Sequence, residues 1–242
     1  MTARQSPFPA RPWQRACQRG FDIIAASAGL LALAPVLLGI ALLVAAGSGR
    51  PVLHRERRIG RHGVPFTLLK FRTLRPGGGT QRSIAPEDDP RITRVGLPLR
   101  RTRLDELPQL FNVLAGDMSL VGPRPMVQQH VDALDPGVRE ALLRVRPGVT
   151  DPASVLFFAE DAVLCGVANA ETVYLQYLLP AKAQVQLDYL SHWHLVRDLC
   201  TIVQTFARVW SPRARRDSIR RVQAILSAAA RPANPAPPPP PP

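Results

Sequence analysis

An uncharged, apolar run over residues 23–46 constrains the fold of this chain more than any other feature. Its 24 residues are enough for a helix that crosses the ~30 Å hydrocarbon core of a bilayer. A cleaved signal peptide has a shorter apolar core of about 7–15 residues, which argues against that class of segment. The run therefore predicts a helix embedded in a membrane.

The flanks of this run and its central proline bear on how the helix lies in the membrane. A simple span has its more basic flank inside the cell, but here both flanks are basic, with arginines at 4, 11, 15 and 19 before the run and at 50, 55, 57, 58 and 61 after it. Pro35, near the middle, removes a backbone hydrogen bond and kinks a helix. A re-entrant helix that bends at Pro35 and returns to the same face accounts for both observations, so we favour it over a single span.

The charge of the chain indicates an anionic partner, because the net charge is +13 in 242 residues. Charge alone leaves nucleic acid, an anionic membrane surface and a phosphorylated substrate open. The sequence has neither zinc-ligand spacing nor interleaved aromatic and basic residues, so we expect no nucleic-acid partner. Cys17, Cys165 and Cys200 are widely separated, which favours a reduced, cytosolic setting.

Beyond the membrane segment, the pattern predicts a β-hairpin with strands within 52–60 and 64–74, joined at residues 61–63. Residues 76–90 are rich in Gly, Pro, Ser and Asp and predict a loop able to cover a site. From residue 185, apolar positions at three- and four-residue steps predict a helix whose stripe packs on the core: Leu190, Trp193, Val196, Leu199, Val203, Phe206 and Trp210. Residues 213–226 predict a basic amphipathic helix that lies on a membrane surface or is solvated; both interpretations remain open.

An acidic pair, Asp105 and Glu106, directly follows a run of arginines at 91, 94, 100, 101 and 103. Cations that bind phosphate then adjoin carboxylates that bind a metal or attack phosphorus, which indicates phosphoryl transfer. Pro108 and apolar residues at 107, 110, 111 and 114 predict a helix that begins here, with both carboxylates at its positive end. A plain helix cap is the alternative role for Asp105.

A series of motifs extends in order along residues 13–210. They are the Pro-broken membrane helix, RIGRHG at 58–63 with Phe66, KFRT at 70–73, DPRITRVG at 89–96, LRRT at 99–102, DELPQL at 105–110, NVL at 112–114, GDMS at 116–119 and GPRP at 122–125. With these motifs the chain resembles the small monotopic bacterial phosphoglycosyl transferases, also called bacterial or undecaprenyl-phosphate sugar transferases. A lone Asp-Glu pair is weak evidence, whereas this many motifs in order are specific.

The resemblance implies an activity: transfer of a sugar 1-phosphate from a nucleoside diphosphate sugar, expected to be a UDP-sugar, to undecaprenyl phosphate, with release of UMP. This is the first membrane step of exopolysaccharide, O-antigen, capsule or glycoprotein glycan synthesis, on the cytoplasmic face of the bacterial inner membrane. By similarity, Asp105 is the nucleophile of an aspartyl-phosphosugar intermediate and Glu106 its companion. Mg²⁺ is expected at Asp105. Four cations match family positions suited to binding substrate phosphates: Arg100, Lys70, Arg72 and Arg124.

The chain departs from the family pattern at three places. Glu56 replaces a glutamine, Ala34 replaces a serine before the membrane proline, and Asp-Pro-Ala-Ser at 151–154 replaces Gly-Trp-Ala-Gln. The last region is expected to help recognise the sugar nucleotide, so the donor sugar cannot be carried over from better-known members.

Together these features predict an α+β monotopic membrane protein with a Pro-kinked re-entrant N-terminal membrane helix, a small β-hairpin and a mainly helical cytoplasmic catalytic domain. The expected segments are a basic leader over 1–20, the membrane helix over 21–47, the catalytic domain over 48–211, the basic amphipathic helix over 212–230 and a disordered Pro-rich tail over 231–242. Anionic membrane lipids are expected partners, and the oligomeric state is left open.

Two alternatives remain. A catalytically inactive membrane scaffold, or a partner-binding protein of a polysaccharide assembly complex, would keep the anchor and the fold, although the intact Asp105-Glu106 pair argues against it. Within the enzyme interpretation, direct transfer in a ternary complex would use both carboxylates only as metal ligands. Nucleotide release without the lipid acceptor separates this mechanism from a covalent one.

Overall fold

A computed structural model describes residues 12–75, 86–167, 169–209 and 211–229. The expected tail over 231–242, residues 1–11 of the leader and residues 76–85 of the expected loop lie outside this described part. The helices are α1 Pro12–Ser48, α2 Gly96–Arg101, α3 Gln109–Ala115, α4 Gln128–Asp132, α5 Pro136–Leu143, α6 Pro152–Leu156, α7 Glu160–Val163, α8 Ala170–Val173, α9 Leu179–Ser191, α10 Leu195–Val209 and α11 Pro212–Ala229. The strands are β1 Leu53–Ile59, β2 Pro65–Phe71, β3 Ser119–Val121 and β4 Gly148–Thr150. Short turns of helix are η1 Arg61–Gly63, η2 Leu104–Glu106 and the π-helical η3 Tyr174–Leu178.

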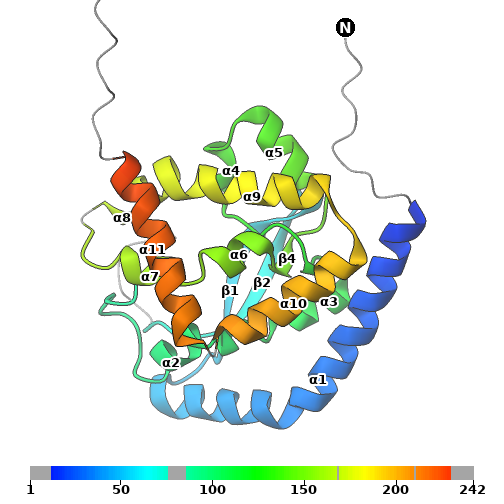
Figure 1. The fold of residues 1–242 in the computed structure, drawn as a ribbon. Helices are drawn as coiled ribbons and strands as arrows, with labels where there is room; N and C mark the ends of the chain where they lie inside the picture. Colours follow the sequence, from blue (N-terminus) through cyan, green and yellow to red (C-terminus); the bar gives the residue numbers. More distant parts are fainter. Residues whose placement is uncertain (1–11, 76–85, 168, 210, 230–242) are drawn as a thin grey trace, which may run out of the picture.

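The arrangement confirms a mainly helical α+β fold. Helices surround two small two-stranded sheets, and α1 wraps around one side of the globular part (Figure 1). The main core lies among α5, α6, α9 and η3, and includes Leu142, Phe157, Leu178 and Tyr189. The β1–β2 hairpin and α3 lie between this core and α1, which places the hairpin next to the apolar N-terminal helix.

Helix α1 contains the whole apolar run, and its most apolar stretch of 18 residues is only 11% buried. Pro35 lies inside it, and Figure 1 shows that the helix bends sharply part-way along its length. Proline gives a physical reason for such a bend, since it has no N–H to donate and its ring clashes with the preceding turn. Length and composition allow α1 to enter a membrane.

Both halves of α1 are attached to the same globular part. In the first half, the buried carboxylate of Asp22 accepts hydrogen bonds from Ser119 Oγ at 2.8 Å and from Leu120 N at 2.9 Å. In the second half, Ile40 and Val44 are buried in a cluster that also holds Phe71 and Leu99. The two ends of the apolar helix therefore return to one domain.

The predicted hairpin is confirmed. Strands β1 and β2 pair antiparallel from Leu53↔Phe71 to Ile59↔Pro65, and the turn η1 joins them. His62 adopts the left-handed backbone region, with φ of 59°, and Gly63 follows with φ of 76°. This chain reversal at residues 61–63 is what the glycine there indicated.

A short parallel pair, β3 with β4, was not predicted from the sequence. The GPRP turn after β3 and the residues before β4 approach so closely that a Cβ on Gly148 would lie 2.1 Å from the nitrogen of Gly122. Only glycine fits at such a contact, so the glycines of the two turns are required by packing.

The single helix predicted from residue 185 is wrong in two respects. The chain breaks at residues 192–194 into α9 and α10, and most of the apolar stripe does not pack on the core. Leu190 and Trp193 are buried, but on α10 the side chains of Val196, Leu199, Val203 and Phe206 are between 43% and 67% exposed. Residue 210, the last position of the predicted stripe, lies outside the described part.

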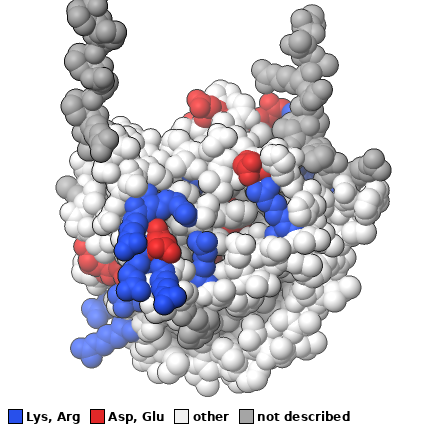
Figure 2. Space-filling model, in the orientation of Figure 1, with Lys and Arg blue, Asp and Glu red and all other residues white. Residues whose placement is uncertain are grey.

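Helix α11 packs on the protein. Val222 is fully buried in the main core, and Ile225 and Leu226 pack against that core. The apolar side of this helix is therefore covered by the domain, an arrangement that neither of the two interpretations of residues 213–226 anticipated. The surface over the bent helix α1, at the bottom and lower right of Figure 2, is free of charged side chains.

Candidate active site

One large cavity of about 910 Å³ opens between the β1–β2 hairpin, the segment 91–109 and the helices α7 and α9. All six residues predicted from the sequence for chemistry or phosphate binding line it: Lys70, Arg72, Arg100, Asp105, Glu106 and Arg124. The volume falls in the range of small-molecule and cofactor sites. Pro35, the predicted kink, lies in α1 and is not part of the lining.

The acidic pair is held by a local turn directly before α3. Arg103 has φ of 58°, in the left-handed region, and η2 then carries Asp105 and Glu106 to the point where α3 begins. Both residues are buried, each 7% exposed. The predicted position at the N-terminal side of a helix is confirmed, although the pair lies in the 3-10 turn and not in the helix itself.

Glu106 is fully engaged in ion pairs. Arg124 Nη1 donates to Glu106 Oε2 at 3.1 Å, Arg124 Nη2 donates to Oε1, and Arg103 Nη1 donates to Oε1 at 3.2 Å. Burial opposes the charge of this carboxylate, but the two guanidiniums outweigh it and hold the pKa of Glu106 far below its ordinary value. Glu106 is therefore an anion whose oxygens are already occupied.

Asp105 lies in the opposite situation. Its Oδ1 is buried and has no hydrogen-bond partner among the described residues. Burial, and then the charge of Glu106, raise the pKa of Asp105 above its ordinary value. The two adjacent carboxylates thus differ: Glu106 is neutralised by arginines, whereas Asp105, which also lines the cavity, has an oxygen without a hydrogen-bond partner in the described part of the chain.

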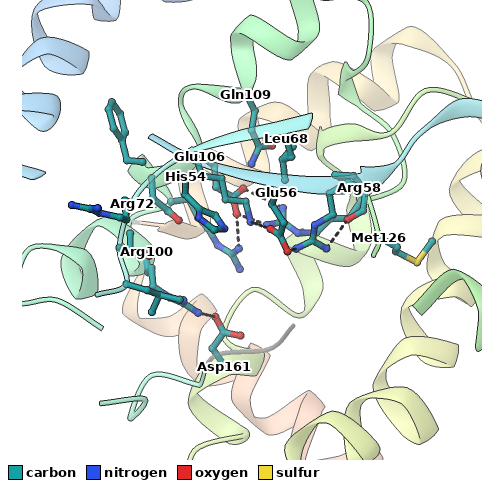
Figure 3. Close-up of a pocket in the computed structure, with 18 of the residues that line it drawn as sticks. His54, Glu56, Arg58, Leu68, Arg72, Arg100, Glu106, Gln109, Met126 and Asp161 are labelled. Atoms are coloured by element: carbon teal, nitrogen blue, oxygen red, sulfur yellow. Dashed lines mark hydrogen bonds and ion pairs between the residues drawn. The ribbon is translucent and has the colours of Figure 1, made fainter. Parts of the chain in front are cut away.

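Lys70 and Arg100 contribute positive charge to the same cavity. Lys70 Nζ lies 4.0 Å from Glu56 Oε2, and burial, followed by the charge of Arg58, lowers the pKa of Lys70 to about 8. Arg100 Nη2 lies 3.5 Å from Asp161 Oδ2, and Figure 3 shows this pair beside the cavity. Both cations are suited to binding phosphate oxygens.

Arg72 is placed differently from the other predicted cations. Its Nη2 donates to the carbonyl oxygens of Ser48 and Gly49, at the end of α1. Figure 3 shows its side chain directed away from the centre of the cavity. In this structure its guanidinium therefore satisfies the last carbonyls of the membrane helix, as basic residues commonly do at helix C-termini.

Several lining residues were missed by the sequence analysis. Lys182 Nζ lies 2.7 Å from Glu160 Oε1 and 3.4 Å from the hydroxyl of Tyr174, on the side of the cavity formed by α7, α9 and η3. Lys182 and Lys70 are the two lysines in a chain with 31 basic residues, so the rarity of lysine was a signal that could have found both. Gln109 was also missed; it is 1% exposed, and both atoms of its amide have no partner among the described residues.

The fit of Mg²⁺ depends on one carboxylate. In the described part of the chain, no group of three or more His, Cys, Asp or Glu side chains could hold a metal ion. Mg²⁺ does not need such a cage, because it is commonly bound through one or two carboxylates and the phosphates of a substrate. The buried, unpartnered Oδ1 of Asp105 fits that mode of binding, whereas the oxygens of Glu106 are taken by arginines.

The order of the motifs is matched by a family model, described as bacterial sugar transferase, over residues 13–212. The chain belongs to the bacterial sugar transferase family. The match begins in α1, includes the hairpin and the acidic pair, and ends where α11 begins.

Three relatives of this bacterial sugar transferase illustrate the similarity. It is 41% identical over 192 residues to a UDP-glucose:undecaprenyl-phosphate glucose-1-phosphate transferase of Xanthomonas campestris pv. campestris, covering 78% of this chain and 37% of the relative. A protein of the same name from Caulobacter vibrioides is 39% identical, covering 78% and 67%. The exopolysaccharide production protein ExoY of Sinorhizobium fredii is 33% identical over 217 residues, covering 82% and 88%. The chain thus spans 37% of the Xanthomonas campestris relative and 88% of the Sinorhizobium fredii relative.

Proposed function

We propose that this protein transfers a sugar 1-phosphate from a UDP-sugar to undecaprenyl phosphate, with release of UMP, as a step of exopolysaccharide synthesis. The observation that carries the proposal is the carboxylate of Asp105, which lines the same cavity as Lys70, Arg100 and Arg124 and is not held by the hydrogen bonds that occupy Glu106. A carboxylate oxygen among cations is suited to attack a phosphorus whose negative charge those cations offset. The names of the relatives, which specify this transfer for those proteins, support the same reaction here.

The first step joins Asp105 to the sugar phosphate. A carboxylate oxygen of Asp105 attacks the β-phosphorus of the UDP-sugar, and the bond from that phosphorus to the bridging oxygen breaks. The bridging oxygen and the electron pair leave with UMP. The aspartyl-phosphosugar that remains is an acyl phosphate, and Glu106 stays ionised between its arginines throughout.

The second step transfers the sugar phosphate to the lipid. A phosphate oxygen of undecaprenyl phosphate attacks the same phosphorus, and the bond between that phosphorus and the Asp105 oxygen breaks. The products are undecaprenyl diphosphate-sugar and the free carboxylate of Asp105. No proton needs to be gained or lost at the dyad in either step.

Phosphate binding in both steps is assigned to the cations of the cavity. Arg100 and Lys70 have side chains facing the cavity and are suited to the diphosphate oxygens. Arg124 supplies positive charge close to Asp105 while it is paired with Glu106, and Arg72 would reach a phosphate only if it left the carbonyls of Ser48 and Gly49. Mg²⁺ bound at Asp105 would offset the charge of the diphosphate and of the leaving UMP.

The position at the membrane follows from α1. Asp22 and Val44, in the two halves of this helix, are both buried against one globular part, which supports a re-entrant helix because a span would carry its ends to opposite faces. The phosphate of undecaprenyl phosphate lies at the membrane surface, so such an arrangement brings the cavity to its substrate. UDP-sugars are made in the cytoplasm, so the domain belongs on the cytoplasmic face of the inner membrane, beside anionic lipids that its net charge of +13 attracts.

The exposed apolar stripe of α10 supports the same orientation. Val196, Leu199, Val203 and Phe206 form a row on one side of an amphipathic helix, which is the pattern of a helix that lies in the membrane interface. The surface over the bend of α1, at the bottom and lower right of Figure 2, is free of charged side chains on the face shown, and a membrane would cover that area.

The test is an assay of UMP release by the detergent-purified chain with Mg²⁺ and a panel of UDP-sugars, with and without undecaprenyl phosphate. We expect turnover that depends on the lipid with one or a few donors, abolished in Asp105→Asn. Asp132→Asn, an exposed surface change, is the matched control and should keep full activity. Absence of release with every UDP-sugar would overturn the UDP donor and direct attention to other nucleotides or to a non-catalytic role.

A further inference from the structure

A second, smaller hollow of about 80 Å³ lies where the first half of α1 meets η1 and the residues before β4. It shares no lining residue with the large cavity. Among the described residues, its wall contains one carboxylate, Asp22, and five arginines, at 15, 19, 61, 144 and 146. The hollow is therefore strongly cationic, and its volume leaves room for a phosphate group.

The carboxylate in this wall is already occupied. Both oxygens of Asp22 accept hydrogen bonds from β3, one from Ser119 Oγ and one from Leu120 N. Among the arginines, Arg144 pairs with Glu140 outside the wall, and both terminal nitrogens of Arg19 donate to backbone carbonyls. These groups fix the shape of the hollow and offset only part of its positive charge.

Two arginines keep donors available to a ligand. Arg61 uses only Nε, which donates to the carbonyl of Arg144 at 3.1 Å, and Arg146 uses only Nε, which donates to the carbonyl of Gly116 at 2.8 Å. Their terminal nitrogens have no hydrogen-bond acceptor within the described part of the chain. The guanidiniums of Arg61 and Arg146 are thus each oriented by one bond while their terminal nitrogens remain able to bind an oxyanion. The side chain of Arg15 makes no hydrogen bond to the described residues.

The arginines also repel one another. Burial, and then the charges of Arg19 and Arg61, lower the pKa of Arg146, and Asp22 opposes this only in part. An anion in the hollow would relieve that repulsion and supply the missing acceptors.

The neighbourhood of the hollow indicates where the anion comes from. Arg15 and Arg19 lie on α1 within three turns of Ile23 and Ile24, which are exposed apolar residues at the start of the membrane run. Trp13, 60% exposed, lies on the same turns, and tryptophan is enriched at the level of lipid headgroups. The hollow therefore lies at the depth at which α1 passes from the basic segment into the apolar one.

We propose that this hollow binds the phosphate of an anionic membrane phospholipid, with the terminal nitrogens of Arg61 and Arg146 as the donors and Arg15 at its edge. The bound headgroup fastens the first half of α1 to the globular part from the membrane side. This site is separate from the proposed catalysis and depends only on α1 being in the membrane.

The experiment measures the thermal stability of the purified full chain in neutral detergent while phosphatidylglycerol, phosphatidylcholine or inorganic phosphate is added. We expect a saturable rise of Tm with phosphatidylglycerol and a much smaller one with the other two. In the double variant Arg61→Gln and Arg146→Gln, the apparent affinity for phosphatidylglycerol should fall by at least about tenfold, since charge-assisted hydrogen bonds are lost. The readout uses no sugar nucleotide, so it is independent of the assay for the proposed function.

Two further variants distinguish loss of the proposed site from a general loss of positive charge and from a loss of folding. Arg216→Gln with Arg221→Gln on α11 removes the same charge from exposed positions and should leave the affinity unchanged. Arg15→Gln removes a guanidinium that makes no hydrogen bond to the described residues, so it cannot disturb the fold through a lost bond, and it should weaken binding by a few-fold. Equal effects of both lipids, or an equal loss in the α11 control, would overturn the proposal. An equal rise of Tm with inorganic phosphate would identify a site for soluble anions and overturn the lipid assignment.

Discussion

Arg124 and Glu106, 18 residues apart in the sequence, form a bidentate ion pair. Each terminal nitrogen of the guanidinium donates to one oxygen of the carboxylate. The pair lies in the wall of the large cavity, next to Asp105. It explains how two adjacent acids acquire different roles, because Glu106 is neutralised within the protein and Asp105 is not.

The first prediction concerns Arg124→Lys. An ammonium group cannot bind both oxygens of Glu106, so the buried carboxylate is left partly unpaired and the turn that carries Asp105 loses its support. We expect kcat/KM for the UDP-sugar to fall by about 10²–10³-fold. Arg220→Lys, which changes an exposed pair with Asp217 on α11, is the control and should stay within about twofold of the unchanged protein. A loss in the control equal to that in Arg124→Lys would refute the assigned role of the pair.

The second prediction concerns pH. Because the pKa of Lys70 is lowered to about 8, its charged fraction falls from about 90% at pH 7 to about 10% at pH 9. A neutral amine no longer attracts the diphosphate, so kcat/KM, which reports on the free enzyme, should fall by up to about tenfold over that range. In the Lys70→Arg variant the guanidinium stays charged, so the profile should be flat between pH 7 and 9. An identical decline in both proteins would assign the titration to another group.

The third prediction tests how the membrane helix is attached. Asp22→Asn keeps the size of the side chain but replaces a charged acceptor of two hydrogen bonds. We expect a loss of about 1–3 kcal/mol, which corresponds to a fall in Tm of about 2–10 °C in neutral detergent. Asp132→Asn, on the exposed surface of α4, should leave Tm within about 2 °C. If the two variants have the same Tm, the buried hydrogen bonds of Asp22 do not hold α1 to the domain.

The fourth prediction places α10 at the membrane surface. An environment-sensitive fluorophore attached to Val203→Cys should shift to the blue when the protein is reconstituted into vesicles, because position 203 lies on the exposed apolar stripe. The same label on the adjacent exposed position, in Gln204→Cys, should shift much less. Both variants are made in a background in which Cys17, Cys165 and Cys200 are replaced by serine, since all three are free. Equal spectra at the two positions would contradict contact of the stripe with lipid.

Features that depend on local patterns in the chain could be predicted from the sequence. The hairpin was predictable because alternating residues and a glycine turn lie together in the chain, and the acidic pair because proline and apolar spacing mark the start of α3. That the predicted cations share one cavity with the pair could be expected from the resemblance to a family but not from the physical pattern alone.

The rest depended on contacts between distant segments. Periodicity in residues 196–206 predicts an apolar stripe, but the same pattern arises whether the stripe faces a core or a membrane, and the burial shows that it does not face the core. The pairing of Arg124 with Glu106, and of Arg72 with the end of α1, joins elements whose approach no local pattern encodes. The parallel pair β3–β4 has only three residues in each strand, too few for a strand signal.

The central claim is that Asp105 forms a covalent bond to the sugar phosphate. The most direct measurement is intact-protein and peptide mass spectrometry of the full chain after incubation with Mg²⁺ and its preferred UDP-sugar in the absence of undecaprenyl phosphate. We predict release of UMP in an amount equal to that of the enzyme, and a mass increase of one sugar phosphate on the peptide that contains Asp105. The added mass should disappear when undecaprenyl phosphate is supplied. UMP release that requires both substrates, with no adduct on the protein, would contradict the covalent account and support direct transfer in a ternary complex.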